Sequence, residues 1–304
     1  MLQKQSKKDS LKYLKPEVIS QLANMDLRAR LVVEGFITGL HRSPYHGFSV
    51  EFAEHRQYMP GDEIKHVDWK VYAKTDRFYV KQFEEETNLK SYLLLDCSAS
   101  MGYKSGVVSK FEYASYLSAA LAHLMIKQRD AVGLLTFDEK IKQYLPPRSI
   151  KSYLFQILRQ LETSKPELKT NISQTLHEMA ERIKRRGLII LFSDLFDDPE
   201  RVLSGLKHFR HRNHEVIVFH ILDPMELSFD FKKDSIFIDV ETDEKINTQP
   251  WHIRQAYQEK LKNFIHYYKK ICLENKIDYV LLNTAQEFDK ALFEYLVKRK
   301  KMGG

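Results

Sequence analysis

The chain has 304 residues, of which 43% are hydrophobic, so it is long enough for one large domain or for one domain with a smaller companion. The longest uninterrupted aliphatic or aromatic run is Leu188 to Phe192, far short of the roughly 20 apolar residues that a membrane-spanning helix requires. We therefore expect no membrane span. The net charge is +7, but the 48 basic residues are mixed with 41 acidic ones along the whole chain, which disfavours a nucleic-acid partner.

The N-terminus and the cysteine usage indicate the compartment. The first ten residues are basic and polar, and no apolar segment of signal-peptide type follows them. Cys97 and Cys272 lie far apart in the sequence and lack the spacing of a thiolate zinc site. We therefore expect a cytoplasmic protein. Because the sequence contains no Gly-x4-Gly-Lys phosphate loop, the chain is not expected to hydrolyse ATP itself.

The first 88 residues are predicted to form a smaller module that combines a helix with strands. Helical periodicity extends from Pro16 to Phe36. Apolar and polar residues alternate imperfectly from Gly47 to Tyr58 and again from Phe78 to Phe83, which is typical of strands. Between these two runs, the Pro60-Gly61 pair has the composition of a type II turn.

Residues 89–304 are predicted to form a doubly wound α/β domain with a mostly parallel sheet, in three layers of Rossmann type. Short, nearly all-apolar runs alternate with longer segments of helical period, as expected for parallel strands that are covered on both faces. The predicted strands are Ser91 to Leu95, Ala131 to Phe137, Leu188 to Ser193, Glu215 to Leu222 and Asp278 to Leu282. The predicted helices are Lys110 to Gln128, Ile150 to Leu161, Ile172 to Lys184, Pro199 to His208, Trp251 to Glu274 and Gln286 to Lys298.

The stretch from Met225 to Gln249 interrupts this alternation. It contains one short strand-like run, Ser235 to Val240. The run fits either an edge strand of the sheet or an insertion, and both interpretations stay open at this point.

Oxygen-bearing side chains follow the strands at positions where a doubly wound sheet binds ligands. Asp96, Ser98 and Ser100 alternate directly after a buried strand, so in an extended turn all three side chains can point toward one cation. Thr170 opens a predicted helix, and Asp194 directly follows the strand that ends at Ser193. These five residues are the predicted metal ligands.

The chemistry of this set favours a small, hard cation. Mg²⁺ prefers octahedral oxygen coordination and retains water molecules, so a few hydroxyls and carboxylates suit it better than they suit Ca²⁺. We expect Mg²⁺ or another divalent cation such as Mn²⁺. Residues of these types are also ordinary helix caps and turn formers, as Asp198 before Pro199 is. Their recurrence at successive strand and helix ends favours the metal site over caps alone.

The spacing Asp96-x-Ser98-x-Ser100, followed by Thr170 and then Asp194, resembles the metal-ion-dependent adhesion site of von Willebrand A domains. The resemblance covers residues from Leu89 to the C-terminus. It implies that the two serines and the threonine ligate the metal and that the two aspartates act directly or through water. In that family glycines commonly precede the threonine, whereas Glu167-Leu168-Lys169 precede it here.

The upstream segment resembles the signature of the domain-of-unknown-function 58 family. Members of that family are often linked with MoxR-type AAA+ ATPases, as partners in maturing or remodelling other proteins. The resemblance therefore implies such an ATPase, or its client, as a partner. The residues that match the signature are Gly39-x3-Ser43-x3-Gly47-x-Ser49-x-Glu51-Phe52, Arg56-x-Tyr58-x-Pro60-Gly61-Asp62 and Val67-Asp68-Trp69.

The functional hypothesis is a metal-dependent protein-interaction module that is not an enzyme. The metal keeps one coordination position open, and an Asp or Glu side chain of a partner fills it, because neutral hydroxyl ligands leave the cation electron-poor. The alternative is a Mg²⁺-dependent phosphoester hydrolase, since a bound metal activates water. That reaction requires a general base and a phosphate clamp, and the sequence shows neither near Ser98 or Asp194.

Two further clusters have simpler interpretations. His208, His211 and His214 recur every three residues and could form a transition-metal site, but cationic side chains at a helix C-terminus also complement the helix dipole. Cys97 lies within the predicted metal loop, where a packed thiol is favoured over a nucleophile because no histidine lies beside it in the sequence.

Overall fold

The structure is a computed structural model. It describes residues 15–20, 24–40, 55–58, 69, 72–73, 76, 78–81, 89–167, 172–233, 235–238 and 245–302.

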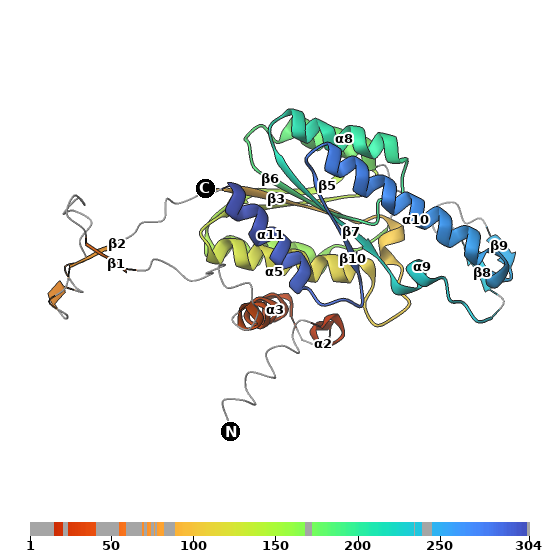
Figure 1. The fold of residues 1–304 in the computed structure, drawn as a ribbon, viewed down its shortest axis with the longest axis horizontal. Helices are drawn as coiled ribbons and strands as arrows, with labels where there is room; N and C mark the ends of the chain where they lie inside the picture. The colour runs from red at the N-terminus through yellow and green to blue at the C-terminus, as the bar shows by residue number, and fades with distance from the viewer. Residues whose placement is uncertain are drawn as a thin grey trace, which may run out of the picture.

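A six-stranded sheet forms the centre of the molecule (Figure 1). Its strands are β3 (Lys90–Asp96), β4 (Ala131–Phe137), β5 (Ile141–Arg148), β6 (Leu188–Ser193), β7 (Glu215–Leu222) and β10 (Asp278–Asn283). Their order across the sheet is β10-β7-β6-β3-β4-β5; β5 pairs antiparallel with β4, and the other pairings are parallel. All five predicted strands are confirmed, and so is the predicted α/β fold class.

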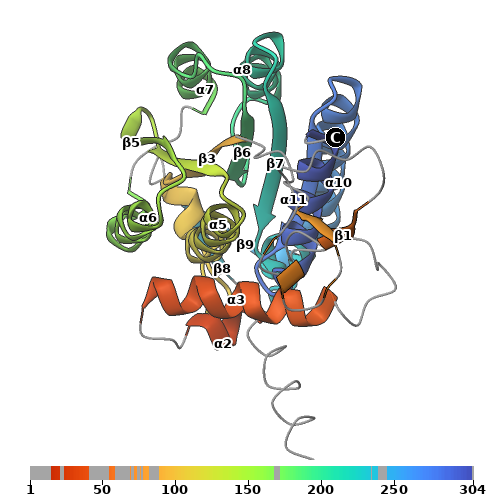
Figure 2. The same ribbon diagram turned by 90° about the vertical axis from the view of Figure 1, so that its left-hand side faces the viewer.

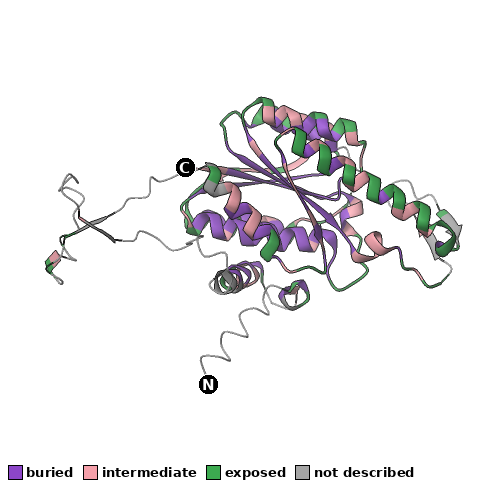
Figure 3. Ribbon diagram, in the orientation of Figure 1, coloured by how far each residue is buried: buried purple, intermediate pink, exposed green. Residues whose placement is uncertain are grey.

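Helices cover both faces of the sheet, because successive side chains of a strand point to opposite faces. Leu93 and Leu95 of β3 belong to one hydrophobic core, and Tyr92 and Leu94 belong to the other. Strands β3, β4, β6 and β7 are almost wholly buried between the two helical layers (Figure 3). The first core is covered by α5 (Lys110–Lys127), α6 (Lys151–Thr163) and α11 (Asp289–Met302), the second by α7 (Ile172–Arg182), α8 (Pro199–His211) and α10 (Pro250–Glu274) (Figure 2).

The N-terminal helices pack on this domain. The predicted helix divides into α2 (Pro16–Ser20) and α3 (Met25–Leu40), and the side chain of Asn24 accepts a hydrogen bond of 2.8 Å from the backbone N–H of Leu27 at the start of α3. Buried residues of α3, among them Val32 and Phe36, share the first hydrophobic core with α5. Figure 2 shows α3 lying across the outer side of α5. The boundary between residues 88 and 89 stays a prediction.

The two strands predicted in the N-terminal region are represented by β1 (His55–Gln57) and β2 (Tyr79–Lys81), which pair antiparallel. The remainder of the first predicted strand, Gly47 to 54, lies outside the described residues, as does the predicted Pro60-Gly61 turn.

Two features differ from the sequence prediction. Strand β5 was not predicted, because Pro146 and Pro147 interrupt its pattern; an edge strand tolerates them, since one of its sides makes no ladder hydrogen bonds. A Cβ atom on Gly133 of β4 would lie 2.6 Å from the carbonyl oxygen of Leu145, so only glycine permits this close approach of the two strands.

The interrupted stretch is an insertion between β7 and α10. It contains the short helix α9 (Pro224–Ser228) and an antiparallel hairpin of β8 (Ser235–Ile238) and β9 (Lys245–Thr248). The hairpin forms a separate two-stranded sheet, so the strand-like run is not an edge strand of the main sheet. Among the described helices, none has the length and apolar character needed to cross a membrane.

His220 of β7 is a buried titratable group outside the predicted site. Its Nδ1 lies 2.5 Å from the hydroxyl of Tyr279, and the rings of Phe264 and Tyr268 meet it edge-on. Burial lowers the pKa of His220 from 6.5 to about 4. The unfolded chain therefore binds a proton at pH values where the folded protein does not, and stability falls as pH falls from about 6.5 toward 4.

We expect the wild-type protein to lose roughly 2 kcal/mol more unfolding free energy than His220→Phe when the pH is lowered from about 7.5 to about 5. Urea denaturation at the two pH values measures this difference. His266→Phe, at an exposed histidine of α10, is the matched control and should resemble the wild type. Equal pH dependence in the wild type and His220→Phe would contradict the assignment.

Candidate functional site

The predicted site lies where the winding of the sheet reverses. From β3 the chain continues to β4 on one side, and β6 pairs with the other side of β3. Asp96 is the last residue of β3, and Asp194 directly follows β6. Ligand sites of doubly wound sheets form at such a reversal, outside the carboxyl ends of the strands.

Asp96 is fully buried, and both of its carboxylate oxygens accept hydrogen bonds. Oδ1 accepts from the backbone N–H of Ser98 at 2.9 Å, and Oδ2 accepts from the hydroxyl of Ser193 at 2.6 Å. Burial, followed by the negative charge of Asp194, raises the pKa of Asp96 to about 7. Within the described part of the chain, no Lys, Arg or His lies within ion-pair distance of Asp96. A buried carboxylate without a cationic partner is costly, so this position fits a bound cation.

The two serines of the loop are brought together. The 3₁₀ helix η3 (Ala99–Gly102) begins directly after Ser98, and its turn places the hydroxyls of Ser98 and Ser100 3.2 Å apart. Adjacent oxygen ligands of an octahedral Mg²⁺ lie about 2.8–3.0 Å apart, because its bonds of about 2.0–2.1 Å meet at right angles. The pair therefore fits two neighbouring coordination positions. Ser98 is buried and Ser100 is half-buried, so the pair lies at the border of the interior.

The backbone after β6 holds Asp194 in place. Leu195 is buried and has a positive φ of 57°, a strained conformation for a residue other than glycine. Its N–H donates to the hydroxyl of Ser193 at 2.9 Å, so the serine that binds Asp96 also holds this turn. The N–H of Phe196 donates to Asp194 Oδ1 at 3.2 Å.

A buried lysine, which the sequence analysis did not identify, contacts Asp194. The Lys110 ammonium lies 2.8 Å from Asp194 Oδ2 and 2.6 Å from Glu226 Oε1, and its side chain is completely buried. Burial disfavours the ammonium, but the two carboxylates outweigh that effect and raise the pKa of Lys110. The ring centroids of Phe196 and Tyr103 lie 4.9 and 5.9 Å from the ammonium. Lys110 thus compensates the charge of Asp194 on one side of the site.

Thr170 lies outside the described residues, but its neighbours on both sides are fixed to the loops of the site. The N–H of Glu167 donates to the carbonyl of Cys97 at 3.1 Å. The N–H of Ile172, at the start of α7, donates to Asp197 Oδ2 at 2.9 Å. The described residues before and after Thr170 are therefore bonded to different loops, Glu167 to the loop after β3 and Ile172 to the loop after β6.

A second acid at this edge of the sheet was also not identified from the sequence. Asp138 follows β4 and is buried, and its Oδ2 lies 2.9 Å from the ammonium of Lys142. Since Lys110 and Lys142 compensate Asp194 and Asp138, Asp96 is distinguished from both by lacking a cationic partner among the described residues.

The other clusters have structural roles. His214 is buried and bonds two backbone groups: Nδ1 accepts from Gly187 at 3.2 Å, and Nε2 lies 3.1 Å from the carbonyl of Ile183. His208 instead pairs with His177, with 3.1 Å between their Nδ1 atoms. Among the described residues, no group of three or more His, Cys, Asp or Glu side chains could hold a metal. Burial raises the pKa of Cys97 to about 12, so it is a packed thiol.

We expect Lys110→Met to lower the free energy of unfolding by about 3–5 kcal/mol, because it leaves two buried carboxylates without a cation. Adding Glu226→Gln to this variant should restore part of the loss, since one of the two charges is then removed. Urea denaturation in EDTA measures both effects. A loss below about 1 kcal/mol for Lys110→Met, typical of an exposed ion pair, would contradict this role.

Comparison with known proteins identifies relatives of the chain. It is 25% identical over 230 residues to the uncharacterized protein Rv1480 of Mycobacterium tuberculosis, covering 75% of this chain and 72% of the relative. Among solved structures, it is similar to the conserved hypothetical protein BatB from Bacteroides thetaiotaomicron, at 17% identity and a TM-score of 0.48, covering 70% of this chain and 98% of that one. It is also similar to the SpRpn10 VWA domain, at 11% identity and a TM-score of 0.38, covering 71% of this chain and 96% of that one. Residues 54–264 match the family described as "Protein of unknown function DUF58", and the chain therefore belongs to that family.

Proposed function

We propose that this chain is a protein-interaction module that depends on a divalent cation. The cation, Mg²⁺ or Mn²⁺, would be held by Asp96, Ser98, Ser100, Thr170 and Asp194. The observation that supports this proposal best is that Asp96, a buried carboxylate with no cationic partner among the described residues, directly precedes a turn that holds two hydroxyls 3.2 Å apart. When bound, the cation supplies a Lewis-acidic position that attracts a carboxylate.

The ligand residues have distinct tasks in this proposal. Asp96 supplies the negative charge and, through its bond to Ser98 N–H, fixes the turn that aligns the two hydroxyls. Asp194 is restrained because Lys110 and the N–H of Phe196 engage its two oxygens. Each oxygen retains a second lone pair for a metal or for a water between them.

The surface beside the site has the character of an interface. Tyr103 and Phe196 expose 38% and 37% of their surfaces, although they are large aromatic side chains. Tyr103 and Phe196 also border the buried Lys110. Aromatic residues are enriched in protein interfaces, so a partner that places an Asp or Glu at the cation would also cover these rings.

We further propose a MoxR-type AAA+ ATPase, or its client, as the partner. Membership of the family supports this choice, through the association described for family members in the sequence analysis. A phosphoester hydrolase is not favoured by any contact of the described residues, because Lys110, the lysine that contacts Asp194, is enclosed by two carboxylates and cannot clamp a phosphate.

Calorimetry with Mn²⁺ and Mg²⁺ tests the proposed cation site. We expect one ion per chain for the wild type and affinity at least about 100-fold weaker for Asp96→Asn, since a charged ligand is lost. In EDTA this variant should be at least as stable as the wild type, because a neutral amide replaces a buried charge without a cationic partner. Asp230→Asn, at an exposed aspartate paired with Arg254, is the matched control and should bind the ion normally. Unchanged ion binding by Asp96→Asn would contradict the proposal.

Copurification with the MoxR-type ATPase of the same genome tests the partner. We expect the wild type to retain the ATPase in Mg²⁺ and to release it in EDTA, and Asp96→Asn to fail to retain it in either condition. Retention that is unaffected by both EDTA and the substitution would contradict a metal-dependent contact.

A further inference from the structure

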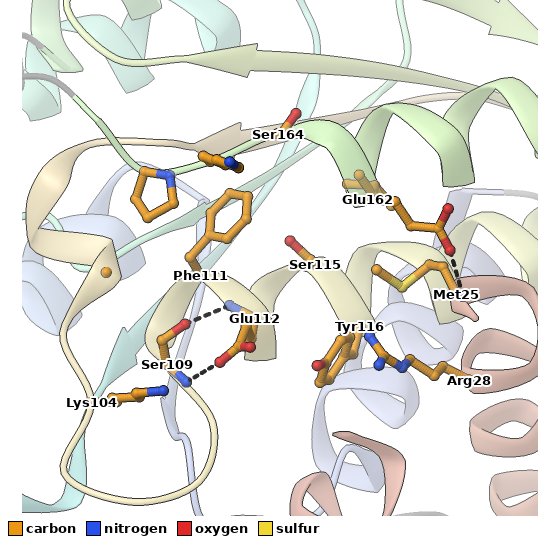
Figure 4. A pocket seen from close by; sticks show the side chains of 14 residues that line it. Met25, Arg28, Lys104, Ser109, Phe111, Glu112, Ser115, Tyr116, Glu162 and Ser164 are labelled. Atoms are coloured by element: carbon orange, nitrogen blue, oxygen red, sulfur yellow. Dashed lines mark hydrogen bonds between the residues drawn. The ribbon is translucent and has the colours of Figure 1, made fainter. Parts of the chain in front are cut away.

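A groove lies beside the candidate metal site, between the N-terminal halves of α3 and α5 and the C-terminal end of α6. Its volume is about 490 Å³ (Figure 4). Its wall includes Phe111 and Leu161, which are nearly buried, together with Pro166. The groove thus has a mixed lining, in which apolar side chains lie among polar and charged ones.

One polar group in the groove lacks a partner. Ser115 is 2% exposed and lines the groove, and its hydroxyl makes no hydrogen bond in the described part of the chain. Figure 4 shows its side chain between Phe111 and Tyr116. A buried hydroxyl without a partner costs free energy, so this group is available to a ligand.

The acidic side chains around the groove are bonded within the fold, whereas two of its lysines are exposed to a ligand. The carboxylate of Glu112 accepts from the backbone N–H of Ser109 at 2.8 Å, and that of Glu162 accepts from the N–H of Met25 at 2.8 Å. Both acids are therefore used within the fold (Figure 4). Lys104 and Lys165 also line the groove, are exposed, and make no ion pair with any described residue. The groove consequently offers positive charge to a ligand.

The groove adjoins the loops that hold the predicted ligands. Gly102, two residues after Ser100, lines it from one side, and Pro166 approaches Gly102 so closely that a Cβ there would lie 3.3 Å from the proline ring. The next residue, Glu167, is bonded to the carbonyl of Cys97 in the metal loop. A ligand that reaches the cation can therefore continue into the groove.

We propose that this groove binds an extended acidic segment of the partner protein. One carboxylate of the segment binds the cation, and further Asp or Glu side chains pair with Lys104 and Lys165 while a polar group of the segment bonds the Ser115 hydroxyl. Side chains of an extended chain that point the same way recur about every 6.4–6.8 Å, which allows one segment to make several such contacts. This inference rests on the proposed function for the carboxylate at the cation, and the lysine contacts add the preference for acidic sequence.

Fluorescence anisotropy with labelled dodecapeptides tests the proposal. Each peptide contains one central Asp among Gly, Ala and Ser, and four further positions are all Glu, all Gln or all Lys. In Mn²⁺ we expect the Glu peptide to bind at least about 10-fold more tightly than the Gln peptide and the Lys peptide to bind most weakly. The double variant Lys104→Glu/Lys165→Glu should lose at least about 10-fold in affinity for the Glu peptide, while its Mn²⁺ affinity measured by calorimetry stays that of the wild type.

Two control variants separate this contact from a general charge effect. Lys260→Glu/Lys262→Glu changes the net charge equally at exposed lysines of α10 and should bind the Glu peptide like the wild type. Lys104→Arg/Lys165→Arg should retain binding. Equal affinity for the Glu and Gln peptides, or an equal loss in both Glu double variants, would overturn the proposal, as would lysine-dependent binding of the oligonucleotide dT12 without binding of the Glu peptide.

The measurements distinguish a failure of the proposed cation site from a failure of the proposed groove. If the wild type binds no Mn²⁺, the cation site is wrong, yet Lys104- and Lys165-dependent binding of the Glu peptide in EDTA would still support the groove. If Mn²⁺ binds and the groove variants bind the Glu peptide like the wild type, the groove proposal alone is wrong.

Discussion

The site depends on how three acids at one edge of the sheet are compensated. Asp194 and Asp138 each contact a lysine of the same chain, at 2.8 and 2.9 Å. Asp96 lies between the strands that precede these two acids, and hydroxyl and amide donors alone surround it among the described residues. Burial makes an uncompensated carboxylate expensive, so the fold leaves one negative charge for which a cation is the natural partner.

The sheet topology explains why the buried charge of Asp96 lies at the end of an otherwise apolar core. β3 and β6 are buried on both faces and end together at the reversal of the sheet, where the chain turns into η3 and α8. The strained turn at Leu195 and the hydroxyl of Ser193 connect the two aspartate loops. The positions of Asp96 and Asp194 are therefore set by strand pairing that hydrophobic burial stabilises, and not by the loops alone.

Much of this arrangement could be predicted from the sequence, because the parallel strands are nearly all-apolar and their ends are marked by polar residues. The bounds of β4, β6 and β7 agree with the prediction to the residue. Strand β5 was not predicted, because its prolines are tolerated only in an edge strand. Which strand lies at the edge of the sheet is decided only when the sheet folds.

The contacts of Lys110 could not be predicted for a different reason. It occupies the first position of an ordinary amphipathic helix, and its partners Asp194 and Glu226 lie 84 and 116 residues away. No local sequence pattern predicts such a contact. The charges meet only because α5 and α9 pack at the same end of the sheet. The lining of the groove combines residues of α3, α5 and α6 in the same way.

Anomalous diffraction at the manganese absorption edge, from crystals grown with Mn²⁺, shows directly whether a cation binds beside Asp96. We expect a single strong peak within coordination distance of both the Ser98 and Ser100 hydroxyls and beside the Asp96 carboxylate. A manganese peak elsewhere on the chain with none at these hydroxyls, or crystals without any bound manganese, would contradict it.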